Sequence, residues 1–269
     1  MQITLQKLAA PKYLHFSILA IGIILLVVNF YGKELTTTVT NLLYVPTPAF
    51  LVILSLIIAF RFRGKGEHGK AWLLFAAFAT SWLAAEYIRL GSDLIYNNTD
   101  SFPPISHYLY HAGYVFLFLF SIFYIRPVEK AISKKMLAYT FILCMTLLLP
   151  TIYVIQSSNP GADSYDLWLV ASHPMADAIV MFPAILSLVL FFKGKVNFLW
   201  SVMFLAITLN IIADTSTLLS SAPDYHYLRN PLDILYLWGY VLFSFGVHSH
   251  IKIFKHYKKN YYANVEDLI

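Results

Sequence analysis

The chain has 269 residues, of which 59% are hydrophobic, 17% aromatic and only 12% charged. Because about a quarter of the residues in a soluble domain are charged, this composition excludes a soluble globular protein and indicates an integral membrane protein. The formal net charge of +5 fits the basic rim of a protein whose partner is a lipid bilayer with anionic headgroups. It therefore calls for no nucleic-acid partner.

Eight apolar stretches are long enough to cross a membrane, which requires about 20 residues in a helix. They predict an all-α bundle with eight transmembrane helices. The predicted spans are 14–31, 46–62, 71–91, 106–125, 136–156, 173–192, 197–219 and 232–251. Because the connections are short, we expect one integral membrane domain over residues 1–269 and no separate soluble domain.

The basic residues predict the orientation, because cytoplasmic loops collect Lys and Arg. With eight spans, all 19 Lys and Arg residues except Lys33, Arg89 and Arg229 fall on the side that holds both termini. Acidic residues such as Asp100 and Asp163 gather on the opposite side. We therefore expect a multi-pass protein of the cell membrane with cytoplasmic N- and C-termini.

Two parts of the chain repeat each other. The segment TPAFLVILSLIIAFRFRGKGEHGKAW (47–72) is matched by DAIVMFPAILSLVLFFKGKVNFLW (177–200), and Tyr-x-x-Gly-Tyr occurs at 110–114 and 236–240. This order predicts a duplicated three-helix unit, spans two to four and six to eight, whose copies are related by a pseudo-twofold axis along the membrane normal. The predicted segments are an extra first helix and outer loop (1–45), repeat 1 (46–128), a linker helix and outer loop (129–172), repeat 2 (173–255) and a basic cytoplasmic tail (256–269).

Ionisable side chains within the spans predict a site, because charged groups inside a bilayer are costly and usually face the bundle interior. Their helical spacings place each set on one helix face, in the outer part of each predicted span. We expect one polar cavity that opens to the outside, binds a small ligand or cation, and receives Glu86, Asp177 and Asp214. Its predicted ligand-binding residues are Glu86, Arg89, His111, Asp177, Asn210, Asp214, Asp233 and Tyr240.

Paired histidines in the sequence are compatible with a metal site. His107 and His111 stand four residues apart, as do His173 and Asp177, and this spacing places two ligands on one helix face. The sequence therefore allows a divalent metal at these four residues, and a metal-dependent membrane-embedded hydrolase as an alternative function. No HExxH, Ser-His-Asp or nucleotide-binding motif occurs, so we expect a non-enzyme rather than an enzyme, and no cofactor is firmly implied.

Retinal needs an intramembrane lysine, which the last span lacks, so we expect no retinal.

Residues 213–247, ADTSTLLSSAPDYHYLRNPLDILYLWGYVLFSFGV, carry a membrane Asp, Pro-Leu-Asp and Tyr-x-x-Gly-Tyr. This stretch loosely resembles the N-terminal multi-pass sensor regions of some histidine kinases and diguanylate cyclases. The resemblance implies a sensor, here expected to lack its own output domain and to reach a membrane or cytoplasmic signalling partner through the basic tail. The order of three helices, a linker and three helices also resembles the transporter and opsin superfamily, which implies a membrane carrier as another alternative.

Overall fold

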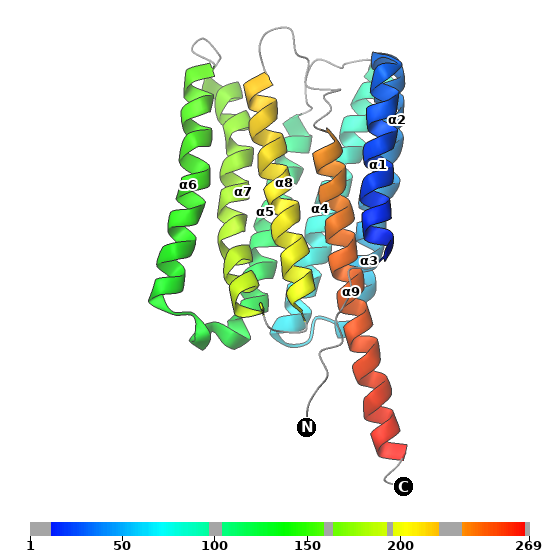
Figure 1. Cartoon of the computed structure of the whole chain (residues 1–269), viewed down its shortest axis with the longest axis vertical. Helices are drawn as coiled ribbons and strands as arrows, with labels where there is room; N and C mark the ends of the chain where they lie inside the picture. Colours follow the sequence, from blue (N-terminus) through cyan, green and yellow to red (C-terminus); the bar gives the residue numbers. More distant parts are fainter. Residues whose placement is uncertain (1–11, 97–103, 159–163, 193–195, 221–232, 267–269) are drawn as a thin grey trace.

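The computed structural model describes residues 12–96, 104–158, 164–192, 196–220 and 233–266. Within these ranges the chain forms helices and turns only, and Figure 1 shows the helices packed side by side in one bundle. The elements are α1 (Lys12–Phe30), α2 (Lys33–Tyr44), α3 (Pro46–Phe62), α4 (Gly66–Tyr96), α5 (Pro104–Ile125), the 3-10 helix η1 (Arg126–Ala131), α6 (Lys134–Ser158), α7 (Ser164–Leu190), α8 (Asn197–Ser220) and α9 (Asp233–Glu266). The predicted all-α class is confirmed.

Seven segments of the described chain are long and apolar enough to cross a membrane. They match the predicted spans except the fifth, which coincides with α6 and is not among the seven. Large apolar side chains on α1, such as Phe16, Leu19 and Leu26, are exposed, as expected for contact with lipid. The fold is thus a helical bundle compatible with a membrane, and the count of eight spans stays a prediction.

Residues 33–44 differ from the sequence prediction, which placed them in an outer loop. They form α2, whose buried residues Thr36, Thr40 and Tyr44 recur every four residues, while Leu35 and Leu42 are exposed. The threonine-rich sequence is typical of a soluble loop, but next to lipid the polar face turns inward and the leucines outward. Pro46 then begins α3, because proline fits the first turn of a helix but cannot continue one.

The two predicted repeats pack with the same order of neighbours. Helices α3, α4 and α5 pack in sequence, as do α7, α8 and α9, while α9 packs against α3 and α5 against α7. Exchanging the first three helices with the last three leaves this pattern unchanged. A pseudo-twofold axis between two copies would produce this arrangement, and the duplication itself stays a prediction.

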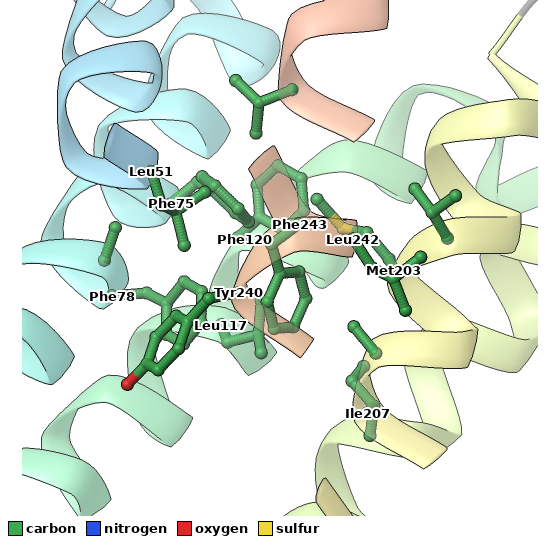
Figure 2. Close-up of a cluster of buried hydrophobic side chains, with 14 of the residues drawn as sticks. Leu51, Phe75, Phe78, Leu117, Phe120, Met203, Ile207, Tyr240, Leu242 and Phe243 are labelled. Carbon is green, nitrogen blue, oxygen red and sulfur yellow. The ribbon is translucent and has the colours of Figure 1, made fainter. Parts of the chain in front are cut away.

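One half of the bundle is filled with aromatic and aliphatic side chains. We call the end at which α3, α5 and α7 terminate the basal end, the lower end in Figure 1, and the opposite end the distal end. In the basal half Phe120 lies 5.3 Å from the Trp72 ring and stacks at 5.6 Å on the Trp200 ring. Figure 2 shows the neighbouring core, where side chains from α3, α4, α5, α8 and α9 interdigitate. This apolar core lies in the basal half, whereas the predicted site residues lie in the distal half.

The glycine of each Tyr-x-x-Gly-Tyr motif allows a close approach of two helices. A β-carbon at Gly113 would lie 2.2 Å from Cδ1 of Trp82 on α4, and one at Gly239 would lie 3.1 Å from Oδ1 of Asn210 on α8. Any larger residue at Gly113 must therefore displace the indole ring.

We predict that Gly113→Ala lowers the stability of the purified protein by about 1–3 kcal/mol, the usual effect of overpacking a core. The matched control is Gly91→Ala on α4, because a β-carbon at Gly91 has nothing within 4 Å. Thermal unfolding in detergent measures both. Equal unfolding temperatures for the two variants would contradict the close packing of α5 on Trp82.

Candidate functional site

An ion pair lies at the centre of the first polar group in the distal half. Arg89 Nη2 lies 2.9 Å from Glu86 Oε2, one turn away on α4, and both side chains are buried. The Arg89 guanidinium carbon also lies 4.5 Å from the centroid of the Tyr44 ring. Tyr240 of α9 donates a hydrogen bond of 3.0 Å to Glu86 Oε1, and Figure 2 shows its hydroxyl pointing away from the apolar core. The guanidinium is therefore held between a carboxylate and an aromatic ring.

Two further residues complete what we call the Arg89 group, defined as Tyr44, Glu86, Arg89, Tyr110, Asp233 and Tyr240. Asp233, the first residue of α9, lies near Arg89 and Glu86, and Tyr44 donates a 3.3 Å hydrogen bond to its backbone carbonyl. Tyr110 of α5 lies near Glu86. The group contains one fixed cation, Arg89, whose positive charge compensates the carboxylates of Glu86 and Asp233.

A second group contains two carboxylates and no such cation. Asp177 of α7 is only 1% exposed and lies next to Asp214 of α8 and Tyr114 of α5. Neither carboxylate oxygen of Asp177 accepts a hydrogen bond of good geometry from the described residues, and its close polar neighbours are the carboxyl group of Asp214 and the hydroxyl group of Tyr114. Tyr236 of α9 donates a hydrogen bond to Asp214 Oδ1, while Asp214 Oδ2 lacks a partner in the same residues. We call Tyr114, Asp177, Asp214 and Tyr236 the Asp177 group.

No Lys or Arg of the described residues forms an ion pair with Asp177 or Asp214. The imidazole of His111 lies near Asp214. Burying a carboxylate without a partner is expensive. The Asp177 group is therefore the part of the molecule that most needs a positively charged or proton-donating partner.

The histidines form a third group beside the second. His107 Nδ1 and His173 Nε2 are 2.9 Å apart, so that one imidazole donates to the other. His111 Nδ1 donates to the His107 carbonyl at 2.7 Å, and its Nε2 lies 2.7 Å from Ser172 Oγ. The described residues contain no group of three or more His, Cys, Asp or Glu side chains that could hold a metal ion. The histidines of the predicted metal set thus come together, but as hydrogen-bonding partners.

The first two groups repeat one pattern across the bundle. Each acid, Glu86 or Asp214, faces the first tyrosine of the Tyr-x-x-Gly-Tyr motif in its own repeat and the second tyrosine of the motif in the other repeat. Tyr110 lies near both acids, so the two groups are continuous. Asp177 and Asp214 therefore lie together, and Glu86 and Asp214 share Tyr110 as a neighbour; the predicted common cavity and its opening to the outside stay predictions.

The remaining predicted residues have mixed outcomes. Asn210 is buried and faces Gly239 of α9. The predicted ligand-binding set contains only one tyrosine, Tyr240. It lacks four other tyrosines that lie beside the carboxylates: Tyr44, Tyr110, Tyr114 and Tyr236. The repeated Tyr-x-x-Gly-Tyr motif was the available signal for three of these four.

Sequence reasoning also missed a polar cluster in the basal half. Trp72 Nε1 donates a 3.2 Å hydrogen bond to His68 Nε2, which lies 3.3 Å from His250 Nε2 of α9. His68 falls outside the predicted third span, in what was expected to be a connection, whereas α4 begins at Gly66. The cluster joins α4 to α9 at the basal end.

Comparison with known proteins finds no family model that matches the chain, and no curated protein or solved structure with significant similarity. The resemblances to sensor regions and carriers therefore stay expectations.

We predict that Glu86→Gln destabilises the protein by about 3–5 kcal/mol, because it leaves the buried Arg89 without its counter-charge. The double variant Glu86→Gln with Arg89→Met should recover most of this loss, since both charges are then absent and Gln still accepts from Tyr240. Thermal unfolding in detergent of the wild type, both single variants and the double variant gives the coupling energy. Additive effects would show that the ion pair contributes nothing to the fold.

Proposed function

We propose that the protein is an integral membrane sensor that binds a small cationic ligand at the Asp177 group. The observation that carries the proposal is Asp177, which is almost fully buried, lies beside a second carboxylate and lacks a hydrogen-bond partner within the described residues. A bound cation would provide the compensation that Arg89 provides for Glu86. Ionisable residues inside membrane spans commonly mark such sites.

The course of α9 supports a sensor. Tyr236 and Tyr240 of this helix bond to Asp214 and Glu86, one acid from each predicted repeat. The same helix continues to Glu266 without a break, and Figure 1 shows it projecting beyond the other helices at the basal end. A shift of α9 on binding would therefore change the position of its projecting end, whose sequence is rich in lysine. We propose this end as the surface for a signalling partner.

A membrane carrier is the second candidate, favoured by the repeated arrangement of acids and tyrosines. Parallel-repeat carriers bind their substrates at the interface between the repeats, and both polar groups contain residues of both predicted repeats. The apolar packing of the basal half around Trp72, Phe120 and Trp200 opposes a path through the bundle. Uptake of labelled cations into proteoliposomes separates the candidates, because a sensor binds without accumulating the cation.

The distal end is proposed to face the outside, because the basic residues gather at the opposite side. Cys144 is the single cysteine, so Cys144→Ser provides a cysteine-free background. In that background we expect Tyr31→Cys, at the distal end of α1, to react in intact cells with a membrane-impermeant maleimide. Lys65→Cys, between α3 and α4, should react only after the cells are opened. The reverse pattern of labelling would invert the topology.

We predict that Asp177→Asn abolishes the stabilisation of the purified protein by cations. Without added ligand the same variant should be more stable than the wild type by about 1–3 kcal/mol, because it removes an uncompensated buried charge. Thermal unfolding with and without cation measures both effects. Glu86→Gln is the matched control, since it also removes one carboxylate charge but is expected to destabilise. If Asp177→Asn retained the full cation response, the proposed site would be wrong.

A further inference from the structure

The ligand class of the Asp177 group can be inferred from the Arg89 group, which serves as its template. We propose that the Asp177 group binds a small organic cation, a protonated amine or a guanidinium, rather than an inorganic cation. The inference rests on the proposed function and adds the chemical class of the ligand to it.

The Arg89 group contains a bound organic cation that belongs to the chain itself. Its guanidinium lies 2.9 Å from a Glu86 oxygen and 4.5 Å from the Tyr44 ring centroid. This geometry combines a charge-assisted hydrogen bond with a cation–π contact. A polar group built from carboxylates and tyrosines on these helices thus accommodates a planar nitrogen cation.

The Asp177 group has the same acceptors without the cation. Asp214 corresponds to Glu86 in its contacts with two motif tyrosines, Tyr236 and Tyr114. In place of an arginine, the group contains the unpartnered carboxylate of Asp177. Asp177 and Asp214 lie next to each other, so a guanidinium or ammonium that reached them could donate to both acids, and the His173 ring, 6.2 Å from that of Tyr114, adds an aromatic wall.

Inorganic cations suit this group less well. Calcium takes six to eight oxygen ligands and magnesium about six in a strict octahedron, whereas the group offers two carboxylates and two phenols. Most backbone carbonyls of α7 and α8 accept helical hydrogen bonds; in α7, Pro183 has no N–H to donate to the carbonyl of Ile179. Aromatic rings next to carboxylates instead favour weakly hydrated organic cations.

The sequence offers a direct test of the template. Arg89 stands three residues after Glu86 on α4, and Thr217 stands three residues after Asp214 on α8. Thr217→Arg would therefore introduce an arginine at the same sequence spacing from Asp214 as Arg89 has from Glu86. We expect this variant to unfold at a higher temperature than the wild type and to lose its response to organic cations. Thr217→Gln, the control of similar length without charge, should keep that response.

The ligand experiment uses the full chain in lipid nanodiscs. Methylguanidinium and methylammonium chloride are compared with NaCl, KCl and MgCl2 at equal ionic strength, by thermal unfolding and isothermal titration calorimetry. We expect saturable stabilisation by the organic cations alone. Asp177→Asn and Asp214→Asn should each weaken their affinity by at least about tenfold, the effect of losing one charge-assisted hydrogen bond.

The outcomes separate the two proposals. Equal or stronger stabilisation by an inorganic cation, lost in Asp177→Asn, would overturn the organic-cation inference and leave the proposed cation site intact. No response to any of the five salts would overturn both. If Thr217→Arg failed to fold, the two Asn variants would still decide, since an unchanged affinity in both would contradict the site.

Discussion

The arrangement of the distal half of the bundle depends on the buried ion pair of Glu86 and Arg89. A charge inside a membrane protein is retained only where another charge and hydrogen bonds compensate it. Arg89 finds both within 2.9 Å on its own helix, and Tyr240 ties the acid to α9. Because α4 and α9 belong to different predicted repeats, this pair fixes how the two halves meet.

The same constraint makes the other polar group unusual. Asp177 and Asp214 lie together on neighbouring helices, and no Lys or Arg of the described residues pairs with them. Tyr236, which donates a hydrogen bond to Asp214, lies one turn before Tyr240 on α9. A cation bound at Asp177 and Asp214 would therefore act on the same helix that contacts the ion pair. That helix, α9, also projects from the basal end, so it connects the proposed binding site to the proposed surface for a signalling partner.

The sequence was informative where burial in a membrane restricts the choice of residue. Carboxylates at helical spacing in apolar spans predicted that Asp177 and Asp214 lie together, because charged groups within a membrane span usually face the bundle interior. It was misleading for α2, where threonines that are typical of a loop face inward. The role of Tyr44, which stands outside the repeated motif, could not be predicted, because tyrosine is common at membrane interfaces and only the packing of helices selects which hydroxyls meet an acid. The absence of a partner for Asp177 also depends on three-dimensional geometry, since His173 and Asp177 share a helix face but the imidazole bonds to His107 instead.

The central claim is that the chain has one cation-binding group, at Asp177 and Asp214, and that Arg89 fills its counterpart. Equilibrium binding of radiolabelled methylguanidinium to the purified protein, by scintillation proximity, tests this most directly through its stoichiometry. The account predicts one cation bound per chain, displaced by unlabelled methylammonium. Saturation at two cations per chain would show that Arg89 does not fill the matching group, and the absence of saturable binding would show that Asp177 and Asp214 do not form an organic-cation site.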